Sequence, residues 1–335
     1  MVTDAYKKDG LDCLAIENDY LKAEFLPILG AKMITLVNKK TGRQFLLESQ
    51  APNGHYRQAV YGANFADYDT SGFDDCFPTV AACEYRSLSE PQRRFDLLLP
   101  DHGELWCRGW NYTIGENQII FTIAGVRLSY ELHKIITLVE NKLSVHYCLR
   151  NTAANPLSYL WSAHPLLRVQ PGDRLILPPE VKQVLLNGAT DPAVGKFEDL
   201  LPWPYLAGSK NNVDFSIVQD HNFGCAVKCF SEPLTAGFAG VYFPSSDESL
   251  LFEFDAKIIP FLGLWLCYGG WPENRYLRHL TVGLEPTNGR PDALAEAVRR
   301  QECTELSGYQ ETNWQLTISV QQGIPIRFEQ NQLSN

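Results

Sequence analysis

The sequence lacks long apolar runs, charge blocks and an excess of basic residues. No apolar stretch approaches the ~20 residues of a membrane-spanning helix, and residues 1–10 carry four charged side chains without the apolar segment of a secretory signal. The 335 residues include 29 Lys and Arg against 39 Asp and Glu, a formal net charge of -10. Nucleic-acid binding relies on clustered basic side chains, so this balance argues against a nucleic-acid or membrane partner. We expect a small, neutral, polyhydroxylated ligand instead.

Cysteine is present, but without the spacing of a disulfide framework. The nine cysteines are scattered singly, and an odd number without framework spacing indicates reduced thiols and predicts a cytoplasmic protein. Cys225 and Cys229 lie near His221, which leaves a metal site as an alternative. However, the segment alternates like a strand, and cysteine is among the residue types most often buried. We therefore interpret both as core residues and expect no metal.

Helical patterns are scarce, and strand patterns dominate. Short β-prone runs bounded by turn residues occupy residues 21–27, 32–38, 44–47, 118–124, 126–138, 142–151, 236–243, 250–255, 261–268, 280–284 and 314–320. Only residues 293–300 favour a helix, preceded by Asp292 and ending in two arginines that suit the helix dipole. We find no linker and no repeat. The chain is therefore predicted to be all-β, an antiparallel sandwich forming one domain over residues 1–335, with one short C-terminal helix.

Two loop-like stretches, residues 51–74 and 187–213, are long for a compact domain. Loops of this length without their own secondary structure are usually functional or mobile.

Three segments combine a histidine or a glutamate with apolar neighbours. In the first, His102 and Gly103 precede Trp106 and Trp110. Sugar recognition needs this pairing, because ring nitrogens bind hydroxyls while flat aromatic faces cover the C–H side of a pyranose. A loop histidine beside core tryptophans explains the segment equally well.

The other two segments each end an apolar run with a polar side chain. His164 follows an aromatic strand pattern and precedes Pro165, which by itself favours a buried, hydrogen-bonded histidine. Glu285 ends the run 280–284 and precedes Pro286, and alternation places its side chain with the buried ones. Buried glutamate is rare unless it is paired or functional, so Glu285 is the stronger candidate.

Together, these segments resemble the aldose 1-epimerase (galactose mutarotase-like) superfamily. The resemblance rests on five short motifs that follow the family's order: residues 29–34 with Thr41 and Gly42, His102 and Gly103 with Arg108 and Trp110, His164 with Pro165, residues 262–265 with their terminal Trp265, and residues 284–287 with Pro291 and Asp292. It covers most of the chain and implies a β-supersandwich with a sugar site. It also implies a small-molecule sugar as partner, no cofactor, and a monomer or homodimer.

The resemblance also implies roles for individual residues. Glu285 would take the proton from the C1 hydroxyl of the sugar, and His164 would protonate the ring oxygen, which opens the hemiacetal before it recloses as the other anomer. His102 would hydrogen-bond the substrate, and we assign Trp110 and Trp265 to sugar binding. Because the pKa of histidine is ordinarily near ~6.5, we expect a neighbouring carboxylate to hold His164 charged.

The chain departs from the best-known galactose mutarotases at two positions. Their arginine after the first sheet and their later substrate-binding aspartate have no clear match here, and the region instead contains Asp74 and Asp75. Either aspartate suits a sugar hydroxyl, and capping of a turn is an equal alternative.

Three other functions stay open at this point. A non-catalytic sugar-binding or sensing protein would explain the missing arginine. A sugar-phosphate epimerase would need a basic cluster, for which Arg57 and Arg93-Arg94 are candidates by composition alone, the latter pair being more typical of a solvated surface. A glycoside hydrolase would need two carboxylates, such as Asp74 or Asp75 with Glu285.

Overall fold

Two large antiparallel sheets form most of the protein in a computed structural model, which describes residues 2–49, 54–68, 70–86, 97–206, 213–272 and 278–325. The larger sheet has 11 strands, in the order β1 (Val2–Lys8), β2 (Leu11–Glu17), β3 (Leu21–Leu26), β4 (Lys32–Asn38), β5 (Phe73–Cys76), β13 (Ser162–Arg168), β21 (Leu280–Thr287), β20 (Phe261–Tyr268), β17 (Cys225–Ser231), β15 (Gln183–Ala189) and β16 (Leu200–Pro202). The second has 8 strands, in the order β14 (Arg174–Ile176), β18 (Phe238–Phe243), β19 (Glu248–Phe254), β23 (Glu311–Gln322), β11 (Lys142–Asn151), β10 (Tyr130–Val139), β9 (Gln118–Ala124) and β8 (Asn111–Ile114).

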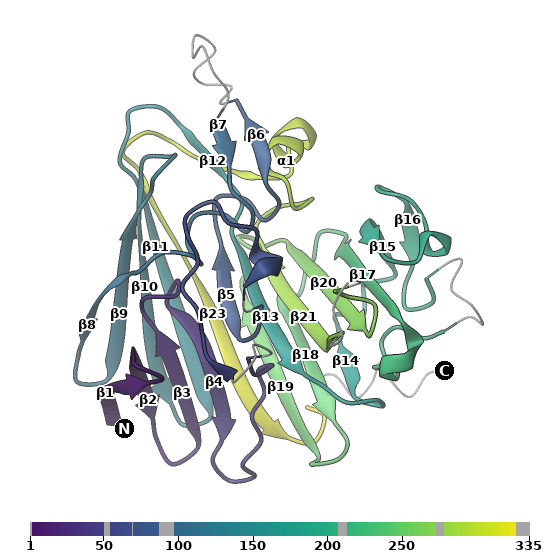
Figure 1. The fold of residues 1–335 in the computed structure, drawn as a ribbon. Helices are drawn as coiled ribbons and strands as arrows, with labels where there is room; N and C mark the ends of the chain where they lie inside the picture. The colour runs from purple at the N-terminus through teal and green to yellow at the C-terminus, as the bar shows by residue number, and fades with distance from the viewer. Residues whose placement is uncertain are drawn as a thin grey trace.

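Smaller elements cover one end of these sheets. Strand β12 (Leu157–Tyr159) pairs with β22 (Thr304–Leu306), and β6 (Cys83–Tyr85) pairs with β7 (Leu97–Leu99). The helix α1 (Leu294–Arg300) lies against β6 and β12, as Figure 1 shows. Short 3-10 turns form η2 (Phe65–Asp67), η3 (Pro192–Val194) and η4 (His221–Phe223). Among the described residues, no helix has the length and apolar character needed to cross a membrane.

The core lies between the two sheets, which are stacked one behind the other in the view of Figure 1. Strands β9, β10 and β11 alternate strictly between buried and partly exposed residues, so each gives one apolar face to the core. The rings of Phe25 on β3 and Phe121 on β9 meet across the interior with centroids 5.7 Å apart. The predicted all-β antiparallel sandwich is thus confirmed, as is a helix at residues 294–300.

Two local predictions were wrong. Residues 44–47 form only isolated bridges, because the Gln44 side chain accepts from the Leu36 N–H and donates to the Ile34 carbonyl, in place of regular ladder bonds. Strand β21 does not end before Glu285 but continues through Pro286 to Thr287, with Pro286 paired to Leu262.

Candidate functional site

A cavity of about 240 Å³ lies over one face of the larger sheet. Strand register explains which side chains meet there, because residues opposite one another in neighbouring strands share a face. Lys228 on β17 is opposite Trp265 on β20, Trp265 is opposite Gly283 on β21, and Gly283 is opposite Leu166 on β13. The cavity is lined by Phe65, Ala66, Thr70, Val80, Ala81, Asp101, His102, His164, Leu166, Asn187, Lys228, Trp265, Trp271, Glu285 and Asp292.

Glu285 and His164 face each other at the floor of this cavity. Strands β13 and β21 pair at Ser162 with Thr287 and at Leu166 with Gly283. Midway between these two pairs, where the strands are not paired with each other, His164 lies opposite Glu285. The Nε2 atom of His164 lies 3.9 Å from Oε1 of Glu285. Among the described residues, neither Glu285 Oε1 nor His164 Nδ1 has a hydrogen-bond partner. Both groups are buried, and Oε1, the glutamate oxygen that faces His164, makes no competing hydrogen bond to a described residue.

Two glycines make room for the Glu285 carboxylate. A Cβ atom at Gly283 would lie 3.0 Å from Glu285 Oε1, and one at Gly263 would lie 3.2 Å from its Cβ. Any side chain at these positions would crowd the carboxylate, so β20 and β21 leave the space beside it free.

His102 forms the wall opposite the sheet. Its backbone is left-handed, with φ +55°, and Gly103 follows at φ +75°, where a Cβ would lie 2.1 Å from the Phe77 carbonyl oxygen. The ring stacks on Phe65 with centroids 4.0 Å apart and meets His164 edge to face at 5.0 Å. Its Nδ1 lies 3.0 Å from Asp101 Oδ1, which fixes the ring orientation. Phe65 belongs to η2, so the first predicted loop does contribute a cavity wall.

Lys228 joins two carboxylates at the side of the cavity. Its ammonium forms an ion pair with Glu285 Oε2 and lies 3.5 Å from Asp292 Oδ1, while Asp292 Oδ2 accepts from Asn187 Nδ2 at 2.9 Å. The register of β15 with β17 shifts between Leu186 and Gly188, and Asn187 is the residue at this irregularity. A bulge of this kind re-aims a side chain, here into the cavity.

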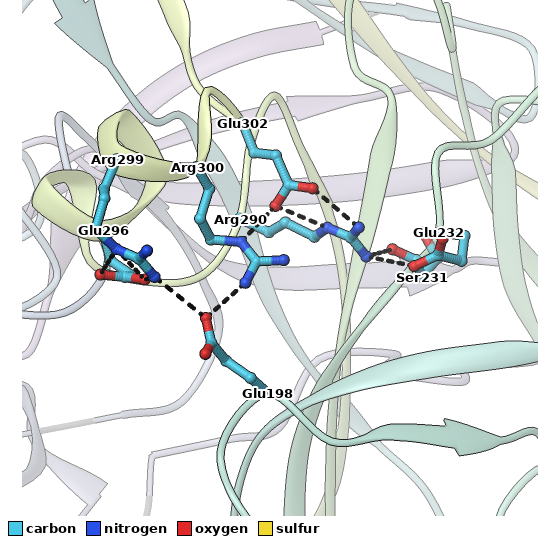
Figure 2. Close-up of polar contacts among 8 residues, drawn as sticks. All are labelled: Glu198, Ser231, Glu232, Arg290, Glu296, Arg299, Arg300 and Glu302. Carbon is cyan, nitrogen blue, oxygen red and sulfur yellow. Dashed lines mark hydrogen bonds and ion pairs between the residues drawn. The ribbon is translucent and has the colours of Figure 1, made fainter.

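The position of Asp292 just before the helix suggested that it caps α1, but its side chain points into the cavity and does not do so. The N-cap is Ala293, without a side-chain cap bond, and the Leu294 N–H donates to Thr79 Oγ1 at 3.0 Å. Two residues before Asp292, the guanidinium of Arg290 is held by Glu302, by Glu232 and by the Ser231 carbonyl (Figure 2). This network fixes the turn that delivers Asp292 to the cavity.

Burial dominates the electrostatics of the pair. It lowers the pKa of His164 well below its usual value, and the nearby His102 and Lys228 lower that pKa further. The expectation that a carboxylate holds His164 charged was therefore wrong. Burial also raises the pKa of Glu285, an effect that Lys228 opposes and Asp292 reinforces. Burial alone would lower the pKa of Lys228, but the carboxylates of Asp292 and Glu285 outweigh it and raise that pKa.

Of the seven residues assigned to the site from the sequence, the cavity brings together Glu285, His164, His102 and Trp265. Trp110 lies outside its lining and belongs to the main core, with its Nε1 donating to the Leu105 carbonyl at 3.4 Å. Asp74 is the cross-strand neighbour of His164, but its carboxylate forms an ion pair with Lys32 at 2.6 Å and does not line the cavity.

Asp75 points to the opposite side of the sheet from Asp74, because adjacent strand residues alternate. Its carboxylate accepts from Tyr147 at 2.7 Å and Trp161 at 3.2 Å and pairs with Lys134 at 2.7 Å. Asp75 is therefore satisfied in the core and is unsuited to the sugar contact suggested above.

Several site residues were not identified from the sequence. Lys228 gave a usable signal, since a lysine inside a strand of buried residues needs a partner. Asp292 appeared in the C-terminal motif of the resemblance but was given no role, and its direction depends on the Arg290 network. Asn187, Phe65 and Trp271 gave no signal, because their positions depend on the bulge and on loop packing. Cys225 and Cys229 lie buried in the main core, as predicted. Arg57 donates to the Asp67 carbonyl and lies outside the cavity lining, while Arg93 and Arg94 fall outside the described residues.

Comparison with solved structures identifies the fold. The chain is similar to a galactose mutarotase-like protein from Lactobacillus casei ATCC 334 (TM-score 0.67, 16% identity, 92% of this chain and 100% of that chain). It is equally similar to a protein from Synechocystis sp. PCC 6803 (TM-score 0.67, 13% identity, 96% of each chain). A galactose mutarotase related enzyme from Lactobacillus acidophilus matches with TM-score 0.64 and 13% identity, over 96% of this chain and 99% of that chain. No family model and no curated protein matches the sequence. The chain therefore has the galactose mutarotase-like fold that its motifs predicted.

Proposed function

We propose that the protein is an aldose 1-epimerase-like enzyme that interconverts the α and β anomers of a hexose. One observation carries the proposal: Glu285 Oε1 and His164 Nε2 face each other 3.9 Å apart in one cavity, and Glu285 Oε1 has no hydrogen-bond partner among the described residues. An acceptor and a donor at this separation can act on two oxygens bonded to the same carbon. The C1 hydroxyl and the ring oxygen of a pyranose are such a pair.

The reaction needs two proton transfers in each direction. Glu285 accepts the proton of the C1 hydroxyl while protonated His164 gives its proton to the ring oxygen, and the bond between C1 and the ring oxygen breaks. The open-chain aldehyde rotates about its C1–C2 bond. Both transfers then run backwards, the ring oxygen attacks the other face of C1, and both side chains regain their starting protonation.

The walls suit a sugar ring. Trp265 and Trp271 meet edge to face with centroids 5.9 Å apart, and Phe65 stacks on His102 on the other side. Aromatic faces cover the C–H side of a pyranose, while the side chains of His102 and Asn187 offer hydrogen bonds to hydroxyls.

The charges favour an unphosphorylated sugar over the sugar-phosphate alternative. Among the described residues that line the cavity, Lys228 is the one Lys or Arg, and two carboxylates already surround it. Phosphate recognition ordinarily uses a cluster of basic groups. The glycoside-hydrolase alternative is also less favoured, because the group that faces Glu285 is a histidine. All nine cysteines are free thiols, which supports the proposed cytoplasmic location.

The test is anomer exchange by NMR on freshly dissolved α-D-glucose, α-D-galactose and glucose 6-phosphate, comparing wild type with Glu285→Gln. We expect wild type to accelerate exchange of a free hexose and the variant to lose that acceleration. A rate unchanged by the substitution would contradict the assignment of Glu285. Sugar binding without acceleration would favour a non-catalytic binding protein, a role that the lowered pKa of His164 also fits.

A further inference from the structure

The cavity holds a lysine that the acid–base mechanism does not use. Lys228 forms its ion pair with Oε2 of Glu285 and leaves Oε1 to face His164. The two carboxylate oxygens are thus divided between two tasks. We propose that Lys228 is a positioning residue for Glu285, and that its ammonium, fixed by Asp292, orients the carboxylate and keeps it ionised for proton transfer. This inference rests on the proposed function.

The position of Lys228 is itself fixed from several sides. Its ammonium lies 5.2 Å from the centre of the Phe230 ring and 3.5 Å from Asp292 Oδ1, and its side chain is 10% exposed. Asp292 is held by Asn187, and its turn is held through Arg290, whose guanidinium Figure 2 shows between Glu302 and Glu232. A lysine on a free surface would lose much of its orienting effect to side-chain motion and screening.

A counter-charge is needed at this position for a physical reason. Glu285 is 0% exposed, and a buried carboxylate without a partner takes up a proton rather than remain charged. A protonated Glu285 could not accept the proton of the C1 hydroxyl. The titratable or charged groups around the Lys228–Glu285 pair come from six segments: Asp74 and Cys76 on β5, Lys32 on β4, Cys229 on β17, His102, His164 on β13, and Asp292 after β21.

A purely structural ion pair is the competing explanation, and the chain offers a matched control for it. Lys134 is more deeply buried than Lys228 and pairs with Asp75 at 2.7 Å, but this pair lies outside the cavity lining. Removing either lysine leaves a buried carboxylate unpaired, so both variants should lose stability. Only loss of Lys228 should change how Glu285 exchanges protons.

The experiment compares wild type, Lys228→Met, Lys228→Arg and Lys134→Met. First, kcat/KM for anomer exchange is measured from pH 5 to pH 9. We expect Lys228→Met to move the limb at which kcat/KM stops rising as the pH falls, where Glu285 takes up a proton, up by at least about one pH unit, with Lys228→Arg close to wild type. Lys134→Met should leave the limb in place. An unmoved limb in folded Lys228→Met would overturn the proposal.

A second measurement separates this inference from the proposed function. In protein labelled with carboxyl-¹³C glutamate, the Glu285 signal is identified by its absence in Glu285→Gln and is titrated with and without Lys228. A shift of its midpoint to higher pH supports the inference even in a protein that exchanges no anomers, and equal midpoints contradict it. Should Lys228→Met fail to fold, Lys228→Gln removes the charge and keeps a polar side chain, and we then expect the limb and the midpoint to move to higher pH as well. Unchanged titration in folded Lys228→Gln would overturn the proposal.

Discussion

Two of the buried lysine–carboxylate pairs, Lys134–Asp75 and Lys228–Glu285, lie in different parts of the molecule and differ in how fully their oxygens are satisfied. Lys134 on β10 and Asp75 on β5 join the two sheets, and Asp75 also accepts from Tyr147 and Trp161. Lys228 and Glu285 lie at the cavity, where Glu285 Oε1 has no hydrogen-bond partner among the described residues. Burial and pairing therefore do not distinguish a functional carboxylate from a structural one. The difference between the two pairs is that Glu285 has an oxygen without a hydrogen-bond partner among the described residues at a cavity, and the proposed function rests on that difference.

The largest expected effect on folding comes from the core pair. Asp75→Asn leaves the Lys134 ammonium without its counter-charge between the sheets, and loss of one partner of a buried pair typically costs about 3–5 kcal/mol. We expect the urea midpoint to fall accordingly while the rate of anomer exchange per folded molecule stays at the wild-type value. A stable variant with a reduced rate of anomer exchange would show that Asp75 takes part in the reaction. The distinction between a structural pair at Asp75 and a functional pair at Glu285 would then be wrong.

The pH dependence tests the cavity pair. Histidine delivers a proton only below its pKa, and burial lowers the pKa of His164 well below its usual value. The protonated fraction therefore grows as the pH falls, and we expect kcat/KM to rise by up to about tenfold per pH unit from pH 8 downwards. The rise should end where Glu285, whose pKa is raised, takes up a proton. The measured limbs belong to the coupled pair rather than to either residue alone. A rate that increases from pH 6 to pH 8 would contradict this assignment.

The smallest expected effect concerns the aromatic walls. Trp265→Ala removes an aromatic contact worth about 0.5–1.5 kcal/mol, so we expect KM to rise about 2- to 10-fold with little change in kcat. Trp110→Phe is the matched control, because Trp110 lies in the core and outside the cavity lining. Steady-state kinetics on both variants decides the point. An equal rise in KM for the two would mean that the effect comes from general loosening of the fold.

Much of the fold could be predicted from local patterns. Strands such as β9 and β11 are recognisable in the sequence by alternating apolar and polar residues, because one face of each strand packs against the core. Glu285 was identifiable as a carboxylate in an apolar strand, but the expected alternation with buried residues was wrong in direction. Val282 and Leu284 face the core, so Glu285 faces the cavity on the other side of the sheet. Alternation also implies that adjacent Asp74 and Asp75 cannot share one face of the sheet.

The rest of the site depends on long-range contacts that no local pattern contains. Which of the two aspartates faces the core depends on Lys134, which comes from the other sheet. The direction of Asp292 depends on Arg290 and its partners, and that of Asn187 depends on a bulge. The charge state of His164 depends on how deeply it is buried, which overrides the simple expectation from a neighbouring carboxylate.

The most direct test of the central claim is the rate of anomer exchange in Glu285→Gln beside Asp75→Asn, at equal concentrations of folded protein and with the sugar that wild type prefers. We predict that Glu285→Gln slows exchange by about 10²–10⁴-fold, the usual contribution of a positioned acid–base group, and that Asp75→Asn keeps the wild-type rate. Wild-type exchange in Glu285→Gln would contradict the account, because the carboxylate at the cavity would then have no part in the chemistry.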